Sequence, residues 1–95
     1  MTLALYSSVP EAEAPNLVAL QDEALTGLPT VLVCPLRPAI TVTSLRVEVA
    51  WHGHKLVACL ELARPVRRTA LRVIGRLDDR TSQAVMTCFF QLLAR

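Results

Sequence analysis

Hydrophobic residues in the first part of the chain form short runs separated by polar or proline-containing segments. The runs at 2–9 (TLALYSSV) and 16–21 (NLVALQ) flank a polar loop at 10–15 (PEAEAP). The run at 30–36 (TVLVCPL) is apolar on both faces, which predicts a central, buried strand. Pro35 cannot donate a ladder hydrogen bond, so it is expected near the end of that strand.

The middle of the chain alternates between apolar and polar positions. In residues 45–51 (LRVEVAW) the apolar side chains fall on one face, which predicts a half-buried strand. A turn at His-Gly-His and the run at 55–62 (KLVACLEL) complete a hairpin. The remaining segments are expected to form a connection at 22–29, loops at 37–44 and 63–69, and a last short strand at 70–75.

The C-terminal segment has the pattern of a helix that runs to about Leu93. Asp78 or Asp79 is expected to cap it, because a carboxylate accepts hydrogen bonds from the free amides of the first turn. Its apolar residues cover nearly two faces, although a surface helix normally has one. We expect one face to seal the chain's own core and the other to lie at a subunit interface. The residues assigned to this interface are Met86, Phe89, Phe90 and Leu93, with one of the two phenylalanines belonging to the core.

These elements predict a single domain, residues 1–95, that is mainly β: a small barrel of antiparallel strands followed by a C-terminal α-helix. Barrel closure removes the exposed edges that an open sheet would present. Hydrophobic residues make up 53% of the chain and the mean hydropathy is +0.42, which indicates either a dense core or apolar surface shared with another chain. The longest apolar runs are too short to cross a membrane, and the N-terminus lacks the basic region of a signal peptide. We therefore expect a cytoplasmic protein with no membrane contact.

Cysteine and histidine offer little sign of a metal or cofactor site. The three cysteines lie far apart and form no CxxC pair, so we expect them to be small buried hydrophobic residues. His52 and His54 could together suit a metal, but no third ligand is near in sequence. We interpret them as solvated turn residues, and we expect neither a metal nor a cofactor.

Charge is distributed unevenly along the chain. Residues 1–36 carry a net −4 and residues 37–95 a net +6. The basic half contains an arginine-rich segment that is either a solvated surface or a docking surface for an acidic protein or a nucleic acid. Aromatic residues are only 4% of the chain, which argues against an exposed platform for base stacking. The arginines of this segment are Arg64, Arg67, Arg68, Arg72 and Arg76.

Several of these segments resemble the CcdB-like toxins, which belong to the larger superfamily of the MazF and PemK toxins of bacterial type II toxin–antitoxin modules. The resemblance covers nearly the whole chain, from LALY through NLVALQ, TVLVCPL and VEVAWHGHKL to RVIGRLDDRTSQAVMTCFFQLL. Its most specific parts are VCPL at 33–36 and the VIG segment that precedes the helix. The resemblance implies an SH3-like barrel, a homodimer, and an antitoxin whose disordered acidic tail would bind the arginine-rich segment.

Within that superfamily, the CcdB-like gyrase poisons fit the N-terminal spacing up to Leu36 without a gap. This is our main interpretation: a toxin that inhibits DNA gyrase by binding, and the implied contact is the DNA-cleaving GyrA component of that enzyme. The family's terminal Trp-Gly-Ile corresponds to Leu93, Ala94 and Arg95, so the key residues differ. The residues expected to contact the target are Leu92, Leu93, Ala94 and Arg95.

The alternative is a MazF-like endoribonuclease, with RNA as its substrate. That branch needs an arginine just before the second strand and a threonine just after the third, where this chain has Ala14 and Arg37. Both departures remove groups expected to act at the scissile phosphate. A rebuilt site would use Arg37 with Thr41 or Thr43. A third interpretation is a protein that has lost toxicity but still binds an antitoxin.

Overall fold

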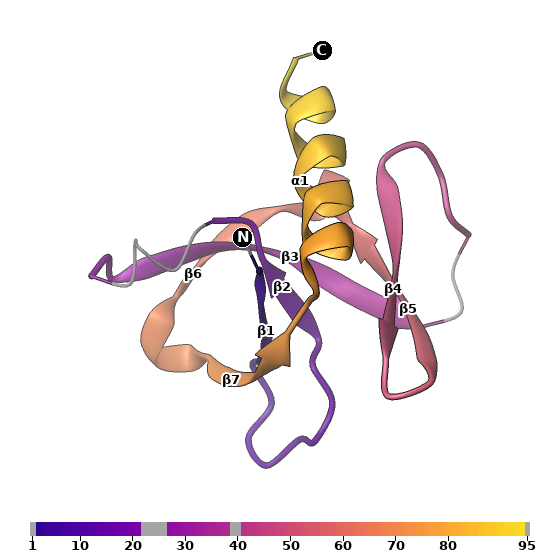
Figure 1. Ribbon diagram of the computed structural model, residues 1–95. Helices are drawn as coiled ribbons and strands as arrows, with labels where there is room; N and C mark the ends of the chain where they lie inside the picture. The colour runs from indigo at the N-terminus through magenta and orange to yellow at the C-terminus, as the bar shows by residue number, and fades with distance from the viewer. Residues whose placement is uncertain (1, 22–26, 39–40, 95) are drawn as a thin grey trace.

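The computed structural model describes residues 2–21, 27–38 and 41–94 of the chain. Most of them lie in antiparallel strands that curl into a partly closed barrel, and helix α1 stands over its opening (Figure 1). The predicted fold class, a small β-barrel with a C-terminal helix, is confirmed. The elements are β1 (Ala4–Ser7), β2 (Leu17–Ala19), β3 (Thr30–Pro38), β4 (Arg46–Trp51), β5 (His54–Cys59), the 3₁₀ turn η2 (Leu60–Leu62), β6 (Arg64–Arg67), the 3₁₀ turn η3 (Arg68–Ala70), β7 (Arg72–Arg76) and α1 (Asp79–Leu93).

Strand β3 is central, as predicted, but it continues past Pro35 to Pro38. Along one edge β3 pairs with β2, and along the other it pairs first with β6, up to Val33, and then with β5, from Leu36. The Leu36 amide donates to Asn16 on the β2 side, so the proline nitrogen faces the opposite edge. That edge is where β6 gives way to β5, so the missing N–H of Pro35 costs no ladder hydrogen bond.

The sheet runs in the order β4-β5-β3-β2-β1-β7, so β4 and β7 are its two ends. These ends meet through a side chain: a Cβ atom placed on Gly75 of β7 would lie 2.8 Å from Cζ3 of Trp51 on β4. A glycine is required there, since real Cβ contacts are never so short. The barrel is thus closed at this point by the indole ring packed on the backbone of β7.

The segment 63–69 was expected to be a loop, and this expectation was wrong. Residues Arg64–Arg67 form β6, which pairs with Thr30–Val33 of β3, and η3 follows. Proline and charged residues obscured the strand in the sequence. They are tolerated there because β6 lies beside a single strand and is half-buried only at Val66.

The predicted β4–β5 hairpin is present, but its turn has two residues and not the three of His-Gly-His, since β5 begins at His54. Trp51 pairs with His54, and the central residues His52 and Gly53 have φ angles of 44° and 81°. Positive φ at both positions is the feature of a type I′ turn, whose twist matches that of the flanking strands. The predicted alternation along β4 is also present, with Val49 fully buried.

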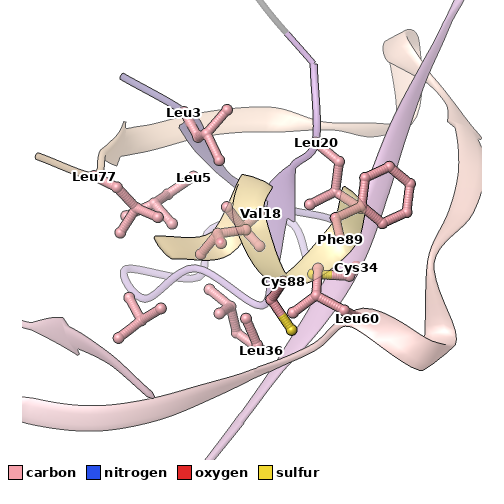
Figure 2. Close-up of a cluster of buried hydrophobic side chains, with 13 residues drawn as sticks. Leu3, Leu5, Val18, Leu20, Cys34, Leu36, Leu60, Leu77, Cys88 and Phe89 are labelled. Atoms are coloured by element: carbon pink, nitrogen blue, oxygen red, sulfur yellow. The ribbon is translucent and has the colours of Figure 1, made fainter. Parts of the chain in front are cut away.

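Two clusters of buried hydrophobic residues pack on the two faces of β1, β2 and β3. In the larger cluster the strands and helix α1 direct side chains toward one another, as Figure 2 shows for Leu5, Val18 and Phe89. All three cysteines are buried, as expected, and burial raises the pKa of Cys34 to about 12. The smaller cluster comprises Ala4, Tyr6, Leu17, Ala19, Val31 and Val33.

Helix α1 is held at its start by two side chains. Asp78 caps it, accepting a hydrogen bond of 2.6 Å from the Thr81 amide, and this bond lowers the pKa of the carboxyl. The fully buried Ser82 hydroxyl accepts a 2.9 Å bond from the Leu3 amide, which ties the helix to the strand at the N-terminus. Among the described residues, no helix has the length and hydrophobicity that crossing a membrane requires.

The two adjacent phenylalanines of α1 lie in different surroundings. Phe89 is 8% exposed and packs in the larger cluster, so it belongs to the core of its own barrel and not to an exposed face. Phe90 is 59% exposed and Leu93 is 64% exposed, while Met86 is half-buried against the core. Of the four residues assigned to a subunit interface, Phe90 and Leu93 therefore present the large free apolar surface.

Candidate functional site

A depression with aromatic, histidine and charged residues in its walls surrounds Trp51. Two adjoining hollows, of about 390 and 460 Å³, share Ala14, Trp51 and His54 in their walls. We call the two together the Trp51 hollow. Its remaining lining residues are Glu13 and His52 on one side and Pro38, Lys55 and Leu56 on the other.

Three elements bring these residues together. The β4–β5 hairpin supplies Trp51 and His54, which are register partners and so point to the same face of the sheet. Leu56 of β5 pairs with Pro38 at the end of β3 and continues that face. The β1–β2 loop crosses opposite and contributes Glu13 and Ala14, whose small side chain leaves the space open.

Trp51 forms the floor between the two hollows. Its ring is half-buried against Gly75 on one side, and the centroid of the His52 ring lies 4.3 Å from its own. A partly exposed indole can stack on a planar group such as a nucleobase. The low aromatic content of the sequence argues against an extended platform, and Trp51 offers one partly exposed ring.

Two imidazole side chains lie beside this floor. Imidazole is the side chain suited to general acid–base catalysis near neutral pH. His52 and His54 are both exposed. Lys55 lies between His54 and Leu56, so its side chain points to the other face of the sheet, where its ammonium lies 4.0 Å from Glu48. The hollow thus combines two imidazoles with an aromatic surface.

The residues proposed from sequence for a rebuilt ribonuclease site do not line this hollow. Arg37 is exposed on β3 between Leu36 and Pro38, so it points to the opposite face of the sheet. Thr41 is exposed, and its carbonyl accepts a 2.9 Å bond from Arg46. Thr43 lines a different depression, of about 570 Å³, between α1 and β4.

That second depression is lined mainly by polar side chains, and the charge of Arg46 in its wall is already paired. The Arg46 guanidinium donates a 2.8 Å bond to Glu61, and this bond raises the pKa of the arginine. Arg80 and the polar side chains of α1 complete the lining. Within the described ranges, no three residues of the His, Cys, Asp and Glu types gather as a metal site would require.

The arginine-rich segment follows β6, η3 and β7 around one side of the barrel (Figure 1). Arg68 of this segment is half-buried and bonded within the barrel. Its guanidinium donates to the Leu28 carbonyl at 3.0 Å and lies 3.5 Å from the Tyr6 hydroxyl. Arg72 donates to the Ala12 carbonyl. The exposed members are Arg64, Arg67, Arg72 and Arg76.

The residues expected to contact gyrase lie at the end of α1. Leu92 is half-buried and packs against the core, whereas Leu93 is 64% exposed and Ala94 is exposed at the C-cap. Arg95 lies outside the described residues. The apolar surface at this end is therefore provided mainly by Leu93 and Phe90.

Sequence reasoning did not find the Trp51 hollow, because its walls come from segments about 40 residues apart. One local signal was present: two histidines flank the glycine of the predicted hairpin turn.

Comparison of the sequence with protein-family models and with curated protein sequences gives no match. Comparison of the structure with solved structures does give matches. The toxin MazF-mt6 of Mycobacterium tuberculosis superposes with a TM-score of 0.74 and 15% identity, over 99% of this chain and 97% of that one. MazF from Deinococcus radiodurans superposes with a TM-score of 0.71 and 18% identity, over 98% of this chain and 93% of that one.

The chain has the fold of the MazF toxins. Identities this low establish the fold and not the activity. The fold agrees with the MazF, PemK and CcdB superfamily that the sequence resembles, but the finer CcdB-like assignment is not confirmed. Both of these structures are of MazF toxins.

Proposed function

We propose that this protein is the toxin of a toxin–antitoxin module and acts as an endoribonuclease that cleaves single-stranded RNA. The observation that carries the proposal is the match to MazF toxins over nearly the full length of both chains. The sequence resembles the same superfamily over nearly the whole chain.

The position of the Trp51 hollow adds to this support. Ala14, which stands where MazF-like ribonucleases have their arginine, lies in its wall. The hollow therefore occurs at the place where the resemblance puts part of the active site. Trp51 would supply a stacking surface for a base there.

The direct test is incubation of the purified protein with a long single-stranded RNA, followed by mapping of the cut sites. We expect a small set of specific cuts, and growth arrest with RNA decay when the protein is induced in bacteria. Intact RNA at high protein excess would reject the proposal. The single tryptophan also allows RNA binding to be followed as quenching of fluorescence, separately from cleavage.

Gyrase inhibition is the second candidate, favoured by the exposed apolar end of α1 at Phe90 and Leu93. A DNA supercoiling assay with purified gyrase tests it, with Leu93→Asp as the variant expected to lose inhibition. Growth arrest with intact RNA would favour this candidate over cleavage. Absence of growth arrest on induction would instead favour the third interpretation, a non-toxic protein that still binds an antitoxin.

The proposed function brings two partners with it. A second copy of the chain would cover Phe90 and Leu93. Exposing these two large apolar side chains to water is unfavourable in free energy. An antitoxin with an acidic tail would meet the exposed arginines of β6 and β7. Analytical ultracentrifugation at micromolar concentration tests the dimer, and a folded monomer there would require another partner for this surface.

A further inference from the structure

We infer that His52 and His54 are the general acid–base pair of the Trp51 hollow. The inference rests on the proposed ribonuclease function and deepens it by naming the groups that transfer protons. The sequence alone favoured solvated turn residues for both. Their common position in the wall of one hollow changes that interpretation.

The geometry of the hairpin places the two imidazoles at one site. His54 is the register partner of Trp51, and His52 begins the turn between them. Both line the hollow that also contains Trp51, so a planar group stacked on the indole would have an imidazole at each end of the turn. Glu13 lies across this hollow from the hairpin, on the β1–β2 loop.

The contact between His52 and Trp51 supports a position at the hollow. The φ angle of His52 is 44°, as the first residue of a type I′ turn requires, and histidine is among the residues other than glycine that adopt it. The centroids of the two rings lie 4.3 Å apart, so the turn holds the imidazole beside the hollow.

The chemistry that fits two imidazoles is internal transesterification of RNA. One neutral imidazole removes the proton of the ribose 2′-hydroxyl, and the oxygen attacks the adjacent phosphorus. The bond from phosphorus to the 5′-oxygen breaks, and the second imidazole, protonated, donates its proton to that oxygen. The products are a 2′,3′-cyclic phosphate and a free 5′-hydroxyl, with no redox change and no further reactant.

Two further charged residues lie near this pair. Glu13 lines the same hollow from the β1–β2 loop. Lys55 follows His54 on β5, and its ammonium lies 4.0 Å from Glu48.

The test compares wild type with His52→Asn, which keeps a residue suited to positive φ, and His54→Gln, which keeps the size of the side chain. Each variant should cleave RNA at least about 100-fold more slowly, as loss of a general acid or base implies, while binding RNA with similar affinity by Trp51 fluorescence. The rate of the wild type should be bell-shaped against pH, and each variant should lose one limb. Gln83→Ala, outside the hollow, is the matched control and should cleave normally.

The outcomes separate the two proposals. Absence of cleavage by the wild type would remove the ribonuclease function and this assignment with it. Cleavage that survives in both folded histidine variants, with an unchanged pH profile, would overturn the assignment alone. Loss of wild-type cleavage in EDTA, with recovery on adding a divalent metal, would also overturn it, because the histidines would then serve as metal ligands.

Discussion

The indole of Trp51 packs directly on the backbone of Gly75, where a methyl group would lie 2.8 Å from ring atom Cζ3. This contact joins the two end strands of the sheet and also fixes the floor of the proposed active site. Stability and function are therefore coupled at one glycine, and the coupling can be tested.

Gly75→Ala should lower the free energy of unfolding by about 1–3 kcal/mol, as expected when extra volume is forced into a packed site. The ring would have to move, so tryptophan fluorescence and near-ultraviolet circular dichroism should change as well. Gly27→Ala is the control, since a Cβ there meets nothing within 4 Å. If the two variants are equally stable, the packing of Trp51 on β7 does not contribute to closure.

Phe89→Ala should lower the free energy of unfolding by roughly 3–5 kcal/mol, because it removes a large side chain from the core and leaves a cavity. Phe90→Ala should change it by no more than about 0.5 kcal/mol in a monomer, since that side chain is 59% exposed. Urea denaturation of both variants gives the comparison. A large, protein-concentration-dependent loss for Phe90→Ala would indicate that a second copy covers it.

Ser82→Ala should cost about 1–3 kcal/mol of stability, because the Leu3 amide would lose its acceptor while remaining buried. Amide hydrogen exchange at Leu3 should also accelerate relative to the amides of β1. Thr87→Ala, exposed on the same helix, is the control and should be neutral or slightly stabilising. Unchanged exchange at Leu3 would contradict the structural tie between the N-terminus and α1.

Asp78→Ala should lower the melting temperature at neutral pH, because the first turn of α1 loses its cap. The pKa of Asp78 is lowered in the folded state, mainly by the hydrogen bond from the Thr81 amide. Its stabilising contribution is therefore present above the ordinary aspartate pKa of about 3.9 and is lost as pH falls through the lower folded value. The difference between the two proteins should shrink on acidification below about pH 4.

Asp78→Asn is the control for that titration, since asparagine caps a helix without ionising. Its stability relative to Asp78→Ala should be nearly independent of pH. A difference between wild type and Asp78→Ala that persists unchanged to pH 2 would show that the cap does not depend on the carboxylate.

The sequence by itself determined the elements whose residues carry local signals. The alternation in 45–51, the apolar run at 30–36 and the aspartate before the helix predicted β4, β3 and the cap of α1, because each depends on neighbouring residues. Periodicity could not reveal β6, whose pairing with β3 overrides the weak strand preference of its proline and arginines.

Tertiary structure decided what depends on contacts between distant segments. Adjacent helix positions are about 100° apart, so the sequence left open which of Phe89 and Phe90 is buried, and the position of α1 on the barrel settles it. Likewise, nothing in the sequence relates Ala14 to His52 and His54. They share one hollow because the sheet curls until the β1–β2 loop faces the β4–β5 hairpin, and that curvature is a property of the closed barrel and not of any segment alone.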